Sequence, residues 1–105
     1  KTFDEEQLKR LGRMCDLLDV AFKAMIENMK TPYNALKDIT NSNDAEYNIN
    51  EYRNTLREEH IINIEENPDY NYQVGVFYMD IVAELEKMGD FIINISEAKI
   101  AENAA

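Results

Sequence analysis

The segment YMDIVAELEKMGDFIINISEA, residues 78–98, decides the fold of this 105-residue chain. Extended back to residue 72, it carries two adjacent rows of mostly apolar residues at steps of three and four, which is the spacing of one broad helix face. The rows are Tyr72, Gly75, Met79, Val82, Glu86, Gly89 and Ile93, beside Val74, Tyr78, Ile81, Leu85, Met88, Ile92 and Ile95. A helix with so wide an apolar face packs against two partners. We therefore predict a helix over residues 70–101 within an antiparallel three-helix bundle.

Near the N-terminus, residues 4–30 repeat apolar side chains in alternating steps of three and four. This pattern predicts a first helix whose inner seam consists of Leu8, Leu11, Cys15, Leu18, Phe22, Met25 and Met29. Thr2 or Asp4 can cap the start of the helix, and the Thr-Pro pair at 31–32 stops the pattern. The lone cysteine lies on the seam, so we expect Cys15 to be a small buried hydrophobic residue.

The middle of the chain predicts a second helix with two alternative starts. Pro32 suits the first position of a helix, and Leu36 and Ile39 would then begin its inner face. Residues 40–43, Thr-Asn-Ser-Asn, weaken helix propensity, so the helix either continues through them or breaks there. From Asp44 the apolar pattern resumes and ends near the turn at 67–69, with inner residues Ile49, Tyr52, Leu56, Ile61 and Ile64.

Composition and charge narrow the fold class and the partners. A content of 45% hydrophobic residues suits one compact core, and only three glycines and two prolines argue against a sheet-rich fold. We predict a single all-α domain over residues 1–105. The formal net charge is −10, which repels phosphate backbones and anionic lipid, so we expect no nucleic-acid partner. No apolar run approaches the roughly 18 residues that a membrane-spanning helix needs, so we also expect no membrane insertion of this segment.

Motifs that would support catalysis are missing from the sequence. There is no Gly-rich phosphate loop, no GxSxG elbow and no CxxC pair. His60 is the only histidine, so neither a His-rich zinc site nor a di-iron site built from Glu-x-x-His motifs can form within one chain. We predict that the protein is not an enzyme.

Two pairs of residues with side-chain oxygens, each pair at helical spacing, are the candidate binding residues. Glu86 and Asp90 lie four apart, so both carboxylates project from the same side of an otherwise apolar helix face. Glu46 and Asn50 have the same spacing on the second helix, and hard divalent or ferric ions favour such oxygen ligands. A bound cation is one way to stabilise carboxylates near a core. For Glu86 and Asp90 the alternative is that both acids edge the seam, reach water and pair with arginines of neighbouring helices: Arg13, Arg53 or Arg57. For Glu46 and Asn50 the alternative is a solvated helix face.

Three further residues bear on this site. Gly89 lies between the two acids of the last helix, and a glycine inside a helix usually marks a close approach or room for a ligand. Asp16 and Asp19 of the first helix are additional candidate oxygen ligands, with a solvated helix face as the alternative.

Residues 85–97, LEKMGDFIINISE, resemble the signature of the PhoU family, whose repeats end in a helix that reads approximately L-E-R-I-G-D-x-x-x-N-I-A-E. The matching residues are Leu85, Glu86, Gly89, Asp90, Asn94, Ile95 and Glu97. Residues 49–61, INEYRNTLREEHI, are similar to the middle helix of PhoU-like domains at the cytoplasmic end of bacterial sodium/phosphate cotransporters.

This resemblance implies a metal site and a dimer. PhoU proteins carry two three-helix repeats whose E(D)xxxD motifs are implicated in binding iron or other multivalent metal clusters. Glu86 and Asp90 take the metal-ligand positions, and Glu46 with Asn50 corresponds to the motif on the preceding helix. Asn50 stands where an Asp is expected, which lowers cation affinity. Because the chain holds one repeat, a homodimer would restore a six-helix arrangement.

The resemblance also implies a role in phosphate transport without catalysis. We expect a cytoplasmic regulatory domain of a sodium-dependent phosphate transporter, on the inner side of the bacterial inner membrane, with the transmembrane transport domain as its partner. The alternatives are a stand-alone PhoU-type regulator of phosphate uptake and a purely structural helical assembly domain.

Overall fold

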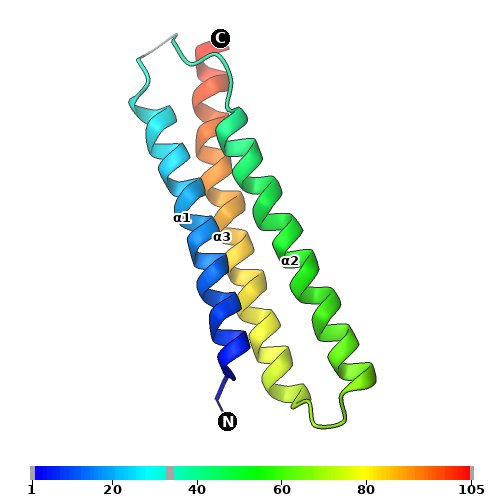
Figure 1. The fold of residues 1–105 in the computed structure, drawn as a ribbon. Helices are drawn as coiled ribbons and strands as arrows, with labels where there is room; N and C mark the ends of the chain where they lie inside the picture. Colours follow the sequence, from blue (N-terminus) through cyan, green and yellow to red (C-terminus); the bar gives the residue numbers. More distant parts are fainter. Residues whose placement is uncertain (1, 33–34, 105) are drawn as a thin grey trace.

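Three long helices pack side by side in a computed structural model that describes residues 2–32 and 35–104 (Figure 1). Helix α1 spans Glu5–Lys30, α2 spans Thr40–Glu66 and α3 spans Tyr72–Ala104. Each helix contacts both of the others, and the bundle measures 56 × 19 × 15 Å. The prediction of an all-α antiparallel three-helix bundle is confirmed.

The start of α1 is fixed by a reciprocal cap. The Asp4 carboxylate accepts a hydrogen bond from the Gln7 backbone N–H at 2.7 Å, and the Gln7 side-chain oxygen accepts one from the Asp4 N–H at 3.0 Å. Glu5 and Glu6 in the first turn complement the positive end of the helix. Of the two predicted caps, the structure selects Asp4.

The inner seam of α1 differs from the predicted one at every second position. Leu18 and Met25 are buried as expected, and Leu11 packs against the core. The residues that alternate with them on the buried face are Gln7, Met14, Ala21 and Asn28, each one position before a predicted residue. The predicted seam residues Leu8, Cys15, Phe22 and Met29 are instead exposed. The prediction failed because polar Gln7 and Asn28 are buried with hydrogen bonds, a pattern that apolar spacing does not reveal.

Helix α2 begins at Thr40, so the predicted start at Pro32 is wrong. Pro32 and Leu36 lie outside any helix, while Tyr33 and Asn34 fall outside the described residues. The weak helix formers 40–43 are helical, because Ser42 is completely buried and bonded to the two other helices. The inner face of α2 is also shorter than predicted, since Ile49 and Leu56 are buried but Ile61 and Ile64 are exposed.

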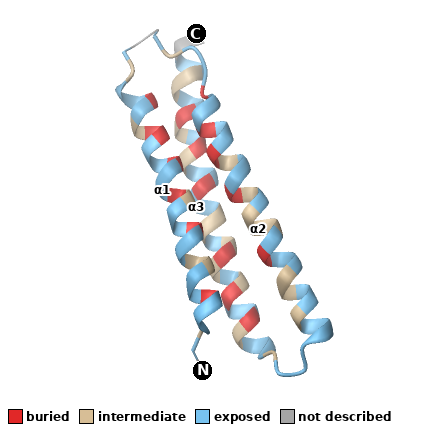
Figure 2. Cartoon of the chain, in the orientation of Figure 1, coloured by how far each residue is buried: buried red, intermediate tan, exposed pale blue. Residues whose placement is uncertain are grey.

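Helix α3 follows its prediction closely. Gly75, Tyr78, Val82, Gly89 and Ile93 are buried, in agreement with the two predicted rows. The rest of the rows is half-buried, apart from two residues, Tyr72 and Met88, that are exposed. Both residues belong to the predicted broad face of α3 but are not covered by the neighbouring helices. Figure 2 shows the resulting arrangement, with most buried residues on the inner sides of the three helices.

A buried polar cluster joins all three helices toward the upper end of the bundle. The Asn28 amide nitrogen of α1 donates to Ser42 Oγ of α2 at 2.9 Å and to Ser96 Oγ of α3 at 3.1 Å. The Ser42 hydroxyl donates to Ser96 Oγ at 3.0 Å, and Asn41 exchanges amide hydrogen bonds with Asn28. Because every member has a partner, the cluster is stable in the core and fixes the register of the helices.

Lys99 of α3 caps the C-terminal end of α1. Its ammonium group donates to the backbone carbonyls of Met29 at 3.0 Å and Thr31 at 2.7 Å. These carbonyls have no partner within the helix, and a cation near them also complements the negative helix end. Helices α1 and α3 run parallel, and residues at the same level of the two helices are 68 to 70 positions apart in sequence. The Asn28–Ser96 hydrogen bond shows the same separation.

Candidate cation-binding seam between α2 and α3

The acidic residues predicted from the sequence meet at the contact between α2 and α3. Glu46, Asn50 and Arg53 follow one another on α2 at steps of four and three, so they form one stripe. Glu86 and Asp90 of α3 lie against this stripe. We call these five residues the acidic seam.

Glu86 is neutralised within the protein. The Arg53 guanidinium forms an ion pair with its carboxylate, and the two side chains are only 19% and 18% exposed. Asn54 holds the guanidinium in place, since its side-chain oxygen accepts hydrogen bonds from Arg53 Nε at 3.3 Å and Nη2 at 3.0 Å. Arg53 is one of the three arginines considered as a partner from the sequence, so the pairing alternative holds for Glu86.

No ion pair joins Glu46 to another described residue, in contrast to Glu86. Its half-burial raises the pKa of the Glu46 carboxyl above the usual value, and the negative charges of Asp90 and Glu97 raise it further. Burial, the nearby negative charges and a side-chain hydrogen bond with Asp90 therefore all act against the ionised form. The upper part of the acidic seam is a place where positive charge from outside would be stabilised.

Asn50 contributes an oxygen without a hydrogen-bond partner. Its side-chain Oδ1 is fully buried and accepts no hydrogen bond from any described residue. Unpaired buried acceptors are uncommon in proteins, and a bound ion or water is one explanation. Asn50 lies one turn from Glu46 on the same stripe of α2.

Gly89 sets the close approach of the helices at this level. A Cβ atom at this position would lie 3.1 Å from Ile49 Cδ1 and 3.5 Å from Leu18 Cδ2, which is tighter than ordinary packing for the first contact. The glycine therefore lets α1, α2 and α3 pack tightly where the acids face each other. The expectation that Gly89 marks a close approach is confirmed.

The pH dependence of stability should reflect the raised pKa of Glu46. Below its ordinary pKa the carboxyl is protonated in both the folded and unfolded states, and as pH rises through the raised folded pKa its ionisation disfavours the fold. Glu46→Gln should therefore raise the free energy of unfolding at pH 7, with the gain disappearing near pH 4. Urea unfolding at both values measures this, with Glu51→Gln on the exposed side of α2 as the control. An equal gain at both pH values would contradict the assignment.

The other sequence candidates lie away from the seam. Asp19 pairs with Lys23 at 2.9 Å on the exposed face of α1, and Asp16 is exposed as well, so the solvated-face interpretation is confirmed for both. His60 is half-buried, and its Nδ1 lies 2.6 Å from the Tyr70 hydroxyl. Cys15, expected in the core, is exposed.

The oxygen atoms of the acidic seam suit a single hydrated metal ion rather than a metal cluster. In the described part of the chain, no group of three or more His, Cys, Asp or Glu side chains is placed to hold a metal ion. With Glu86 held by Arg53, the remaining donors are the carboxylates of Glu46 and Asp90 and the Asn50 amide oxygen. A Mg²⁺-like ion that keeps several waters is compatible with two carboxylates, whereas a multinuclear iron site needs more ligands.

Comparisons with protein-family models, with curated proteins and with solved structures find no match to this chain. In the described residues, none of the three helices combines the length and the apolar character that crossing a bilayer requires.

Proposed function

We propose that this chain is a cytoplasmic regulatory domain of the PhoU type, acting on a sodium-dependent phosphate transporter. The observation that carries the proposal is the placement of the signature residues of α3. Glu86 and Asp90 lie against α2, and Gly89 packs tightly between them on Ile49 and Leu18. The reading frame that encodes the chain tests the transporter assignment: a preceding series of apolar helices supports it, and their absence favours the stand-alone regulator.

The regulatory ligand of this proposal is a hydrated multivalent cation at the acidic seam. Glu46, Asp90 and the free oxygen of Asn50 would hold it, and its charge would relieve the repulsion that raises the pKa of Glu46. Because these residues belong to two helices, binding would pull α2 and α3 together. Glu86 contributes only if the cation displaces Arg53.

Cation binding should be visible as a thermal shift. We expect Mn²⁺ or Mg²⁺ to raise the melting temperature of protein prepared with chelator, because an ion that binds only the folded state stabilises it. Asp90→Asn should reduce that shift strongly, while Asp80→Asn, at an exposed position of the same helix, should leave it unchanged. Identical shifts in both variants, or none in the wild type, would favour the structural assembly domain.

A homodimer is part of the proposal, and the outer apolar face is its interface. This face consists of Leu8, Cys15, Phe22 and Met29 of α1 with Phe77, Met88 and Phe91 of α3, all exposed. The α1 residues recur every seven positions, which is the repeat of a helix packed lengthwise on another helix. The parallel offset of α1 and α3 puts Leu8 level with Phe77 and Phe22 level with Phe91. Leu8 and Phe77 also line one apolar hollow.

A second copy of the chain suits this face for two reasons. The chain carries a net charge of −10, so a like-charged copy is repelled unless apolar contact compensates, and the outer apolar face supplies apolar side chains for such contact. Gly12, between Leu8 and Cys15, has no atom within 4 Å of where its Cβ would lie. No contact with a described residue explains this helix-weakening glycine, and the space beside it would admit a second helix at close approach.

Placing a charge on this face should disrupt the dimer. We expect sedimentation equilibrium to show a dimer for the wild type and at least about a tenfold higher dissociation constant for Phe22→Glu, since a carboxylate would be buried there. Val20→Glu is the matched control, because Val20 is similarly exposed on α1 outside the outer apolar face. A monomeric wild type, or equal effects of both substitutions, would contradict the interface.

A further inference from the structure

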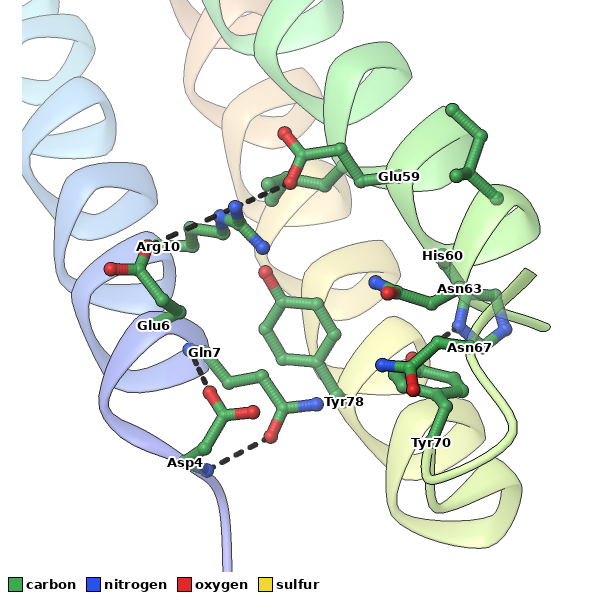
Figure 3. A pocket seen from close by; sticks show the side chains of 12 residues that line it. Asp4, Glu6, Gln7, Arg10, Glu59, His60, Asn63, Asn67, Tyr70 and Tyr78 are labelled. Carbon is green, nitrogen blue, oxygen red and sulfur yellow. Dashed lines mark hydrogen bonds and ion pairs between the residues drawn. The ribbon is translucent and has the colours of Figure 1, made fainter. Parts of the chain in front are cut away.

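A cavity of about 390 Å³ lies at the end of the bundle where α1 begins and α2 ends (Figure 3). It draws side chains from all three helices and from the turn between α2 and α3, and we call it the basal cavity. The lining residues that bear on its chemistry are Gln7, Arg10, Glu59, Asn63, Asn67 and Tyr78. Its volume falls in the lower part of the range of small-molecule sites, about 300 to 1,000 Å³.

Tyr78 presents an unsatisfied hydroxyl at this cavity. The residue is only 3% exposed, and its hydroxyl oxygen is buried without a hydrogen-bond partner among the described residues. Burial raises the pKa of Tyr78 far above its usual range, so the hydroxyl keeps its proton and remains a donor. A buried hydroxyl without a partner costs stability, whereas phenylalanine would fill the same space without that cost. Retention of the hydroxyl is understandable if a ligand satisfies it.

The charged groups around the basal cavity are already engaged. Arg10 pairs with Glu59 at 2.5 Å and with Glu6 at 3.8 Å, and the Asp4 carboxylate caps α1. Three carboxylates against one guanidinium leave a formal charge of −2, since burial lowers the pKa of His60 and keeps its ring neutral. An anionic ligand would be repelled by this excess of negative charge.

The groups left for recognition are the Asn63 carboxamide, the Gln7 amide N–H group, whose oxygen already accepts the Asp4 backbone N–H, and the partly exposed ring of Tyr70. Figure 3 shows the amide ends of Gln7 and Asn63 directed toward Tyr78 from opposite sides. The Asn63 side chain makes no hydrogen bond with any described residue, and Asn67 uses its oxygen for the Asp69 backbone N–H. Asn and Gln amides pair with the edges of nucleobases through matched donors and acceptors, and tyrosine rings stack on them.

We infer that the basal cavity binds an uncharged planar molecule with amide-like donors and acceptors, of the nucleobase or nucleoside class. The ligand lies beside the partly exposed ring of Tyr70, with its edge between Gln7 and Asn63. An acceptor on the ligand reaches the Tyr78 hydroxyl when the Arg10 side chain, which is partly exposed at the rim, swings aside. A phosphate group on the ligand is excluded by the negative rim. This site is separate from the acidic seam and from the outer apolar face.

Titration of the intact chain with adenosine, guanosine, cytidine and uridine, followed by NMR, tests the inference. We expect at least one of them to give saturable shifts at the basal cavity at up to millimolar concentration. Its 5′-monophosphate should bind at least about threefold more weakly at low salt, with the difference shrinking as salt screens the rim. No saturation by any of the four, or equal affinity for the monophosphate, would overturn the proposal.

Tyr78→Phe separates ligand binding from folding. Loss of one hydrogen bond should weaken nucleoside binding by about three- to tenfold, while removal of the unpaired hydroxyl should leave the melting temperature equal or higher. Tyr72→Phe, at an exposed tyrosine of the same helix, should change neither quantity. Asn63→Ala provides a second reduction in affinity at a half-buried position outside the core. Unchanged affinity in Tyr78→Phe and Asn63→Ala would rule the site out.

Discussion

Arg53→Met is expected to lower the free energy of unfolding by about 2–3 kcal/mol at pH 7. The substitution keeps the apolar part of the side chain but leaves the Glu86 carboxylate, only 18% exposed, without its counter-charge. Breaking a fully buried pair costs about 3–5 kcal/mol, and the partial exposure of this one reduces the loss. Urea denaturation monitored by circular dichroism measures the change.

Two further variants show where that loss comes from. Arg57→Met changes an exposed arginine one turn further along α2, and we expect a loss below about 0.5 kcal/mol. Arg53→Met combined with Glu86→Leu should recover most of the stability, because it removes the stranded charge as well. If Arg53→Met were no more damaging than Arg57→Met, the pair would act as a surface ion pair and the neutralisation of Glu86 would be unsupported.

Asn28→Ala is expected to cost about 2–3 kcal/mol, the second large effect. It removes the donor to Ser42 and Ser96 and the exchange with Asn41, and it leaves a small void where three helices meet. The two serines keep their mutual bond at 3.0 Å, which limits the damage. The better helix propensity of alanine offsets a few tenths of a kcal/mol. Urea denaturation again provides the measurement.

Asn94→Ala is the matched control for this prediction. Asn94 is exposed on α3, so the same chemical change there should be neutral or slightly stabilising. A similar response of both variants would mean that the buried cluster contributes little to stability. A large loss confined to Asn28→Ala would show that the buried cluster stabilises the bundle.

The fold could be predicted because α3 shows its packing directly in its sequence. Apolar residues at steps of three and four, such as Tyr78, Val82 and Ile93, are buried in the structure. Helix α1 was predicted correctly as a helix, but its seam was placed one position too far along at alternate turns. Two apolar stripes compete on α1, and the buried one contains Gln7 and Asn28, whose hydrogen-bond partners lie outside the local sequence.

The candidate sites were predictable to different degrees. The acidic seam could be located because each of its acid or amide pairs lies four residues apart on one helix. The pairing of Glu86 with Arg53 joins residues 33 apart and was one of several possibilities. The basal cavity could not be predicted at all. Gln7, Asn63 and Tyr78 come from three different helices. What distinguishes Tyr78 is that its buried hydroxyl has no hydrogen-bond partner among the described residues, which only the structure shows.

The hydrogen bonds from Lys99 to the carbonyls of Met29 and Thr31 join the C-terminal ends of two helices, α1 and α3. Neither the last turn of α1 nor the end of α3 can fray alone without losing these bonds, so both should open in one cooperative event. Amide hydrogens in the two segments should therefore exchange with deuterium at matching free energies of opening. A truncation just before Lys99 would accelerate exchange near Met29, some 70 residues away in sequence.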